Sequence, residues 1–301
     1  MAGTQIKDLK LLKVVDGDTI KVELNGETES LRLLALDTEE SNSGSNKPVT
    51  NAGQLASQWA KQYFDCDEEG FPLSEARVDI EFDTNDSIED SLKKHRGNYG
   101  RLLCYVLKDG ENYNLEAVKS GWSPYFVKYG RSRLFHNEFL QAESEAMAEV
   151  RSVWDESINA TGQKRDYQQL LPWWFMRGSV VDDYRKSGVA HGVKSIRLDY
   201  PDIIKAAENR EKITVFCDLQ GGIHKRPGDG ALIFAGSPQH KFDLWIPDRL
   251  SDEAQKILNL IEKRYMKFGR GYVYVSGEIH FFRADRPQII LESFSQLTDV
   301  V

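Results

Sequence analysis

Two stretches, Val15-Asp16-Gly17-Asp18-Thr19 and Arg32-Leu33-Leu34-Ala35-Leu36-Asp37-Thr38-Glu39-Glu40, decide how the first half of this chain folds. Each places carboxylates at the end of an apolar run, and the second also carries an arginine. In both stretches the apolar residues predict a β-strand and the acids mark its end. The fold of this region therefore follows from how these two strand ends are brought together.

The surrounding residues predict a three-stranded meander. Asn25-Gly26 is a strong signal for a two-residue hairpin. The three expected strands cover residues 11–15, 20–24 and 30–36. In such a meander the first strand ends at the same sheet edge as the third. We therefore expect Asp18 and Asp37 to be neighbours in space.

Clustered carboxylates repel one another and stay together when a cation holds them. An oxygen-only site of this kind suits a hard ion such as Ca²⁺ or Mg²⁺. Arg32, together with Arg101 at the start of another apolar strand, adds guanidinium groups that bind phosphate oxygens in pairs. Glu40, just past the strand end, could remain off the metal and act on a water molecule. The pattern indicates metal-assisted chemistry at a phosphate.

One geometric condition applies to this site. Positions 32 and 37 differ by an odd number, so in a regular strand their side chains would point to opposite faces. The third strand must bend, bulge or end before Asp37 for Arg32 and Asp37 to meet.

These residues make the chain resemble the staphylococcal nuclease (thermonuclease) family over about residues 8–154. The resemblance rests on Asp-Gly-Asp-Thr at 16–19, the segment 32–40, Tyr99-Gly100-Arg101, and the region from 114 to Trp154. It implies an OB-type five-stranded barrel with three helices. It also implies Ca²⁺-dependent hydrolysis of phosphodiester bonds in DNA and RNA, leaving a 3′ phosphate.

The resemblance also assigns roles to matching positions. The metal ligands would be Asp18, Asp37 and the backbone carbonyl of Thr38, and Glu40 would be the carboxylate that acts on the attacking water. Arg32 and Arg101 would bind the phosphate. Tyr99 and, by a looser match, Tyr129 would contact the nucleotide. Two positions depart from the family pattern. Glu39 stands where proline is frequent, and Gly97 stands where aspartate is common. Neither departure removes a catalytic group.

Composition bounds the class of protein. At 301 residues the chain is long enough for two domains. No apolar run approaches the roughly 18 residues of a membrane span. The first residues lack the apolar core of a signal peptide, and three scattered cysteines favour a reducing compartment, so we expect a cytoplasmic protein. Residues 1–155 carry 18 Lys+Arg against 28 Asp+Glu, a net charge of −10, whereas 156–301 carry 21 against 19. The first half is thus poorly suited to attracting a polyanion over long range.

The pattern of elements predicts a nuclease-like domain at 1–155, a helical linker at 156–195 and a second domain at 196–301. In the first domain we expect a loop at 41–50, which is either a substrate-facing lid or an ordinary surface loop. The elements expected after it are a helix at 51–65, a strand at 77–82, a polar excursion at 83–97, a short helix capped by Asn114, and a helix at 137–153. Residues 155–166 read as a polar linker. A helix at 167–186 carries bunched aromatic residues, either a face that docks the domains or a platform for bases.

The second domain reads as an OB-like barrel. The expected order is strands at 212–219, 231–235 and 241–246, a helix at 251–265, then strands at 272–282 and 288–294, after a helix at 201–210. The overall fold class is thus α+β and mainly β, with two OB-type barrels. Basic and aromatic residues alternate over 263–286, a combination that binds single strands. We expect Lys263, Arg264, Lys267 and Arg270 to bind substrate, although aromatics that fill a barrel beneath solvated charges would give the same pattern.

The sequence therefore predicts a Ca²⁺-dependent nuclease acting on DNA or RNA, with single strands preferred and a second domain that helps bind the substrate. The alternative is a non-catalytic scaffold in which both barrels grip nucleic acid or protein. Loss of Asp18, Glu40 or either arginine would favour the scaffold, and all four are present. The sequence defines no preference between DNA and RNA and no oligomeric state.

Overall fold

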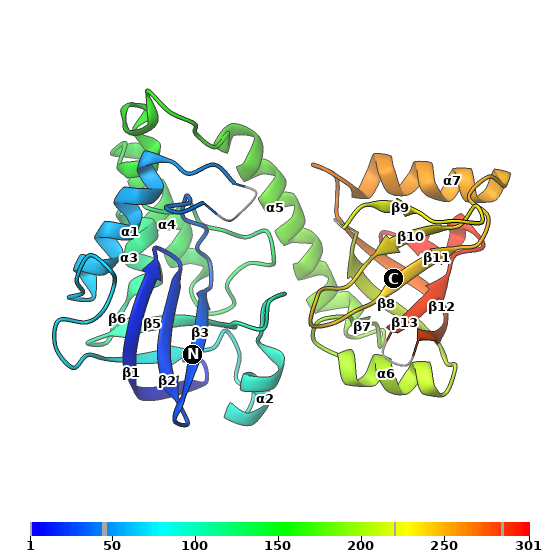
Figure 1. Cartoon of the computed structure of the whole chain (residues 1–301), viewed down its shortest axis with the longest axis horizontal. Helices are drawn as coiled ribbons and strands as arrows, with labels where there is room; N and C mark the ends of the chain where they lie inside the picture. The colour runs from blue at the N-terminus through cyan, green and yellow to red at the C-terminus, as the bar shows by residue number, and fades with distance from the viewer. Residues whose placement is uncertain (1, 44–46, 220, 284–285) are drawn as a thin grey trace. The chain divides into compact units, whose positions relative to one another are not determined.

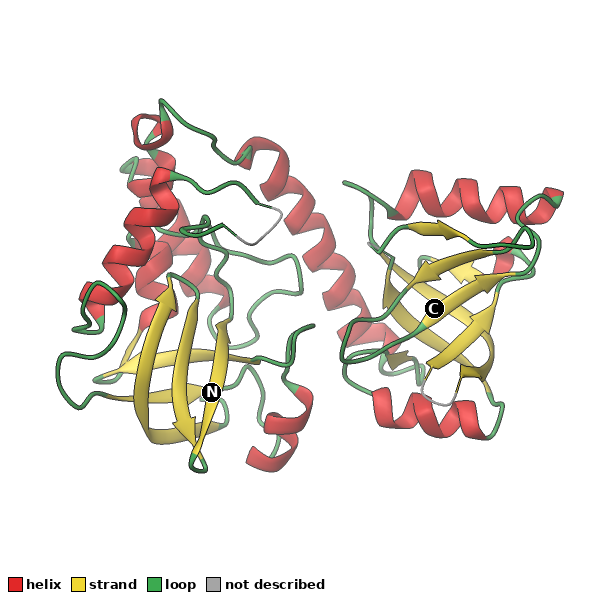
Figure 2. Cartoon of the chain, in the orientation of Figure 1, coloured by secondary structure: helices red, strands yellow, loops and turns green. Residues whose placement is uncertain are grey.

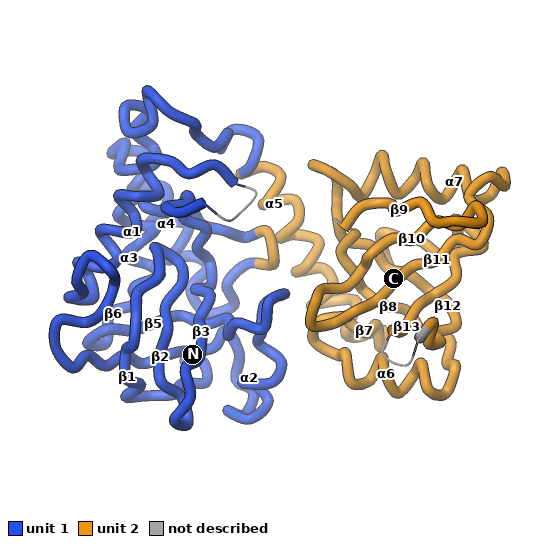
Figure 3. The backbone as a smooth tube through the Cα atoms, viewed as in Figure 1, with its two compact units in different colours: residues 1–127, 131–170 blue, residues 128–130, 171–301 orange. Residues whose placement is uncertain are grey.

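The computed structural model describes residues 2–43, 47–219, 221–283 and 286–301. The chain divides into two compact units (Figure 3), unit 1 with residues 1–127 and 131–170, and unit 2 with residues 128–130 and 171–301. Over the described residues, no helix combines the length and apolarity needed to cross a membrane.

Unit 1 is built on a β-barrel (Figure 1). Its strands are β1 (Gln5–Asp16), β2 (Thr19–Leu24), β3 (Glu27–Leu33), β4 (Arg77–Glu81), β5 (Leu102–Lys108) and the two-residue β6 (Glu111–Asn112). They run in the order β3-β2-β1-β4-β5-β6. A parallel pairing of β3 with β5, which places Leu31 opposite Leu102, closes the five main strands into the barrel that the sequence predicts.

The meander forms as expected because its turn residues allow it. Asn25 and Gly26 have φ values of 54° and 80°, the left-handed backbone that a two-residue hairpin requires. Apolar side chains on one face, among them Val14 and Ile20, are fully buried in the barrel. The third strand has seven residues, as predicted, but it covers Glu27–Leu33 instead of 30–36. It ends at Leu33, and Ala35 follows with a φ of 63°, so the chain turns before it reaches Asp37.

Helices pack around this barrel (Figure 2). They are α1 (Asn51–Tyr63), α2 (Ile88–Lys94), α3 (Tyr113–Lys119), α4 (His136–Ala148) and the 3₁₀ turns η1 (Ser152–Trp154) and η2 (Glu156–Asn159). Four predictions were wrong in detail. The predicted polar excursion contains α2, which Ser87 caps. Asn112, not Asn114, caps α3. The helix predicted at 137–153 ends at Ala148, because Val150 and Ser152 adopt left-handed backbone. The predicted polar linker includes η2.

Unit 2 is a second β-structure. Its strands are β7 (Lys194–Ser195), β8 (Lys212–Asp218), β9 (Ile223–Lys225), β10 (Ala231–Phe234), β11 (Asp243–Ile246), β12 (Tyr272–Arg283), β13 (Arg286–Ile290) and β14 (Leu297–Thr298). They follow the order β7-β8-β12-β13-β11-β10-β9, with β11 and β13 parallel. The short strand β9 was not predicted. The strand predicted at 288–294 ends at Ile290, because Ser293 then caps a 3₁₀ turn, η5 (Phe294–Gln296).

The helices associated with unit 2 are α5 (Tyr167–Asp183), which begins in unit 1, the π-helix η3 (Tyr184–Gly188), α6 (Tyr200–Glu208), α7 (Asp252–Leu260) and the π-helix η4 (Ile261–Tyr265). Ser251 caps α7 as expected, with its side chain accepting from the Ala254 amide. One core cluster joins the sheet to α6 and α7, and Ile203, Val215 and Leu244 are fully buried in it. A second cluster joins the sheet to α5 and η3. The helix α7 separates β11 from β12 as predicted, but four strands, β8 to β11, stand where three were predicted.

Candidate active site

The turn between β1 and β2 carries the first acidic pair. The Asp16 side chain accepts a hydrogen bond from the Asp18 amide at 3.0 Å, which closes the turn. Gly17 is required there for space, because a Cβ on it would lie 2.7 Å from the Thr38 side chain. The Tyr113 hydroxyl donates to the Gly17 carbonyl at 2.9 Å and fixes the turn against α3. The turn is thus held from three directions.

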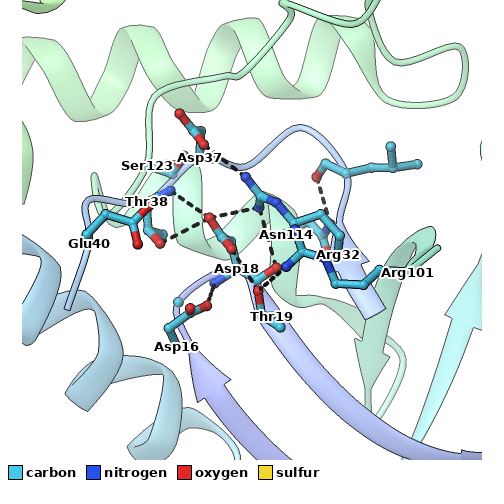
Figure 4. Close-up of polar contacts among 12 residues, drawn as sticks. Asp16, Asp18, Thr19, Arg32, Asp37, Thr38, Glu40, Arg101, Asn114 and Ser123 are labelled. Carbon is cyan, nitrogen blue, oxygen red and sulfur yellow. Dashed lines mark hydrogen bonds and ion pairs between the residues drawn. The ribbon is translucent and has the colours of Figure 1, made fainter. Parts of the chain in front are cut away.

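Arg32 joins the two separated acids (Figure 4). Its guanidinium contacts Asp18 Oδ2 at 2.7 Å and Asp37 Oδ1 at 2.9 Å. The end of β3 at Leu33 and the left-handed Ala35 meet the geometric condition set by the odd spacing. The neighbourhood of Asp18 and Asp37 that the meander predicts is therefore present.

Short polar side chains orient these acids further. Thr38 donates to Asp18 Oδ2 through its amide at 3.2 Å and its hydroxyl at 3.3 Å, while Thr19 donates to the other oxygen at 3.0 Å. The Ser123 hydroxyl accepts from the Asp37 amide at 2.9 Å. Asp18, Asp37 and Thr38 are all buried. Two carboxylates in fixed orientation, rather than a loose acidic surface, form this part of the site.

The second predicted arginine reaches the same edge of the barrel. Gly100 has a φ of 79° and turns the chain into β5, and Arg101 stands directly before the first residue of that strand. The Arg101 guanidinium donates to the Thr19 hydroxyl at 3.2 Å, so it lies one residue from Asp18 (Figure 4). Tyr99 on this loop is 73% exposed. Tyr129, the looser match, belongs to unit 2, and its role stays a prediction.

Glu40 is linked to the acids through Lys47. The Lys47 ammonium contacts Asp37 Oδ1 at 2.8 Å and Glu40 Oε1 at 3.1 Å. Lys47 belongs to the loop predicted at 41–50, of which 44–46 lie outside the described residues. The structure therefore brings Asp18, Asp37, Thr38, Arg32, Arg101 and Glu40 into one connected set of contacts.

Charge balance within the site affects its acids differently. Burial alone would raise the pKa of Asp37, but Arg165, Lys47 and Arg32 outweigh it and hold that pKa well below its usual range. Asp16 behaves in the opposite way. Burial, followed by the charge of Asp18, raises its pKa to about 7. The site thus has strong positive charge around Asp37 and less fully compensated negative charge at the β1–β2 turn.

Thr19, Lys47 and Ser123 were not predicted as site residues, and three more unpredicted residues come from later in the chain. Arg165 contacts Asp37 Oδ2 at 2.7 Å, and Tyr167 and Asn159 donate to Glu39 at 3.0 and 3.4 Å. Asn159 and Arg165 come from the segment predicted to be a polar linker. Glu39 was the available signal, because a carboxylate where proline is frequent needs partners if it is buried.

The predicted basic set in unit 2 is partly neutralised. Arg264 pairs with Asp299, with Nε 2.6 Å from Oδ2, and Arg270 pairs with the same carboxylate at 3.3 Å. Lys263 and Lys267 are exposed. The four residues lie close in sequence, yet two of them share a single acidic partner.

Comparison with known proteins identifies relatives of the region that contains most of this site. Residues 30–156 match the family described as staphylococcal nuclease homologue. The chain is 30% identical over 146 residues to a thermonuclease of Staphylococcus hyicus, covering 48% of this chain and 74% of that protein. It is 31% identical over 153 residues to the SPbeta prophage-derived endonuclease YokF of Bacillus subtilis, covering 51% of this chain and 46% of YokF. It is 29% identical over 159 residues to the endonuclease YncB of the same organism, covering 53% of this chain and 67% of YncB.

The chain belongs to the staphylococcal nuclease family. The matched residues include Arg32, Asp37, Glu40 and Arg101, whereas Asp18 precedes them. The chain spans less than half the length of YokF. Of unit 2, only residues 128–130 lie within the family match.

Proposed function

We propose that unit 1 hydrolyses phosphodiester bonds of DNA or RNA and that it uses Ca²⁺. The observation that carries the proposal is the bridge from Arg32 to both Asp18 and Asp37, with Arg101 one hydrogen bond away through Thr19. Two fixed carboxylates beside two guanidinium groups match a cation and a phosphate placed side by side.

The donor chemistry fits a hard cation. Asp18, Asp37 and the Thr38 carbonyl would hold it, and all three offer oxygen. Among the described residues, no group of three or more His, Cys, Asp or Glu side chains is arranged to hold a metal. The two carboxylates and one carbonyl named above would leave several coordination positions to water and substrate, which suits the loose geometry of Ca²⁺ better than the strict octahedron of Mg²⁺. When bound, Ca²⁺ would supply electrophilic stabilisation of the phosphoryl oxygens.

The chain's own residues define the remaining steps. Arg32 and Arg101 stay charged at any working pH and would neutralise charge that develops on the phosphate as water attacks. Glu40 would orient that water and accept its proton. Lys47 contacts both Glu40 and Asp37 and would hold Glu40 near the acids until substrate arrives. The hydrogen bond to the buried Thr19 limits how far Arg101 can move away.

We further propose that unit 2 helps to bind single-stranded nucleic acid. A hollow of about 480 Å³ lies on its sheet, lined in part by Arg226, Arg286, Trp245 and Phe282. Phe282 is 58% exposed. Guanidinium groups beside accessible aromatic rings combine phosphate attraction with base stacking, which is how single strands are held without sequence readout.

Two features give this hollow a defined shape. The Trp245 ring lies directly on Gly230, where an added Cβ would stand 2.0 Å from a ring atom, so the ring cannot sink further. Asp243 is 2% exposed, lines the hollow and lies 3.6 Å from the Arg286 guanidinium. Burial raises the pKa of that carboxyl, against the lowering effect of Arg286 and Arg226. Lys263, Arg264, Lys267 and Arg270 would add phosphate contacts outside the hollow.

A non-catalytic scaffold remains the second candidate, and one observation favours it. Three basic side chains, those of Arg32, Lys47 and Arg165, already occupy the carboxylate of Asp37. A scaffold that needs no metal could keep such a neutralised acid. The two candidates differ in whether a divalent cation can bind at Asp37 and produce turnover.

The test is to incubate the full chain with single- and double-stranded DNA and RNA, in Ca²⁺, in Mg²⁺ and in EDTA. We expect cleavage in Ca²⁺, weak cleavage in Mg²⁺ and none in EDTA. Calorimetry should detect Ca²⁺ binding that Asp37→Ala abolishes. Binding of oligonucleotide without cleavage in any metal would support the scaffold, and full activity in EDTA would refute the metal-dependent mechanism.

A further inference from the structure

The buried carboxylate of Glu39 is held by a segment that follows the family match. Glu39 is 2% exposed. Its Oε1 accepts from the Tyr167 hydroxyl at 3.0 Å, and its Oε2 accepts from the Asn159 amide group at 3.4 Å. Burying a carboxylate is costly unless both oxygens find donors. Both donors come from residues beyond 156, where the family match ends.

The same segment also holds Asp37, two residues earlier. The Arg165 guanidinium donates to Asp37 Oδ2 at 2.7 Å and to the Asp37 main-chain carbonyl at 3.1 Å. Its side chain is only 8% exposed, and its guanidinium lies 5.5 Å from the centre of the Tyr167 ring. Arg165 therefore fixes the backbone and the side chain of Asp37 together.

A third set of contacts anchors the segment to α1. Asn159 Oδ1 accepts from the Ala52 amide at 3.0 Å, and the Asn51 side chain donates to the Ile158 carbonyl at 2.9 Å. The helix itself presses on the loop, because a Cβ on Gly53 would lie 2.2 Å from the Glu40 carbonyl oxygen. Residues 39 and 40 therefore lie between α1 and the segment that contains Asn159.

We propose that Asn159, Arg165 and Tyr167, called here the clamp, are positioning residues that set Asp37 and Glu40 for the reaction. The inference rests on the proposed nuclease function. Each clamp residue acts through a neighbour: Arg165 through Asp37, and the other two through Glu39, which is adjacent to Glu40. The clamp also accounts for Glu39 in place of the frequent proline, since a proline side chain could not accept hydrogen bonds from Asn159 and Tyr167.

The opposite role for Arg165 would be competition with a bound cation. The two roles predict opposite signs. Removing a competing positive charge would raise Ca²⁺ affinity, whereas removing a positioning contact lowers it. Arg165 is nearly buried and also holds a main-chain carbonyl, a contact that competition with a metal does not require. The geometry therefore favours positioning.

The test uses the full chain and measures Ca²⁺ binding, turnover and amide hydrogen exchange. Loss of a hydrogen-bond partner of a metal-binding group typically costs about 10- to 100-fold in affinity or activity. We expect Tyr167→Phe, which keeps shape and charge, to lower kcat by about this factor with KM nearly unchanged. Arg165→Met should lower Ca²⁺ affinity by about 10-fold or more, and Arg165→Lys should recover part of it. Exchange should rise in residues 36–41 in Tyr167→Phe and Arg165→Met.

Matched controls separate these effects from general damage. Tyr200→Phe removes one hydroxyl bonded to the Lys241 carbonyl in unit 2, and Arg77→Met removes an exposed pairing with Asp8 and Glu75. Both should leave Ca²⁺ affinity and kcat unchanged. Thermal unfolding of each variant reports whether the fold is retained.

The outcomes are distinguishable from a failure of the proposed function. Wild-type kcat in Tyr167→Phe, or a higher Ca²⁺ affinity in Arg165→Met, would overturn the clamp while leaving the nuclease assignment intact. A wild-type chain that neither binds Ca²⁺ nor cleaves would refute the proposed function and, with it, the catalytic role of the clamp. Increased exchange at 36–41 with unchanged affinity and turnover would also overturn the positioning role.

Discussion

The acid cluster in unit 1 and the hollow in unit 2 both contain arginine, but the side chains around the arginine differ. In unit 1, Arg32 is bound to two buried carboxylates, and its position is dictated by those partners. In unit 2, Arg226 and Arg286 line a hollow together with Trp245. In unit 1, contacts with both carboxylates hold the guanidinium charge in a fixed position. A group that stabilises a transition state must be positioned in this way. The hollow in unit 2 offers charge and stacking surface, which holding a flexible strand requires.

The comparison predicts its largest effect at Glu40. Glu40→Gln removes the proposed proton acceptor while preserving shape, so we expect kcat to fall by about 10²- to 10⁴-fold, the range for general base catalysis. Ca²⁺ affinity and oligonucleotide binding should change little. Steady-state kinetics and calorimetry on the same preparation check both.

Glu89→Gln is the matched control, because Glu89 is an exposed carboxylate paired with Lys93 on α2. It should have wild-type turnover. Near-normal turnover in Glu40→Gln would remove Glu40 from the mechanism.

The next largest effect concerns the two arginines that we propose to bind phosphate. Arg101→Ala and Arg32→Ala should each lower kcat by about 10²- to 10³-fold, the scale of losing one preorganised stabilising group. Arg32→Ala should also lower thermal stability, because Asp18 and Asp37 lose the guanidinium between them. Kinetics and thermal unfolding measure the two consequences, and Arg77→Ala serves as the control. Equal stability of the two variants would contradict the bridging role of Arg32.

A smaller effect is expected at Trp245, and of a different kind. Base stacking on an aromatic side chain is worth about 1–3 kcal/mol per base. Trp245→Ala should therefore raise KM for single-stranded substrate roughly 5- to 150-fold and leave kcat unchanged. Phe294→Ala, at a half-exposed aromatic of unit 2 that does not line the hollow, is the control. A fall in kcat with unchanged KM would place Trp245 outside substrate capture.

The smallest effect distinguishes the basic residues of unit 2 by their partners. For single strands, each phosphate that the protein no longer neutralises reduces the log–log slope of binding against salt by roughly 0.7. Neutralising Lys263 and Lys267 together should show this reduction. Arg264 and Arg270 should show less, because Asp299 already offsets their charge. Fluorescence titration at several salt concentrations gives the slopes, and equal slopes for both pairs would contradict the argument.

The sequence predicts the first region far better than the second. The alternation of strands and the Asn25-Gly26 turn are local signals, and they are enough to bring Asp18 to Asp37. Arg165 could not be foreseen in the same way. It lies more than a hundred residues from Asp37, in a polar segment without a periodic pattern, and only the tertiary fold brings it there.

The hollow in unit 2 shows a second limit of sequence reasoning. The basic and aromatic run at 263–286 indicates a binding surface because its residues are close in sequence. Trp245 lies on β11 and Arg226 directly follows β9. The pairing of β9 with β10, β10 with β11 and β11 with β13 brings them to Arg286. Burial also removes part of the aromatic run from the surface, since Tyr265 and Tyr274 are buried.

The most direct test of the division between cleavage and capture is one kinetic experiment on three chains. Wild type, Glu40→Gln and Trp245→Ala are assayed side by side in Ca²⁺ on the same labelled single-stranded oligonucleotide. We expect Glu40→Gln to lose kcat with KM retained, and Trp245→Ala to raise KM with kcat retained. Undiminished cleavage by Glu40→Gln, or identical kinetics for Trp245→Ala and wild type, would contradict it.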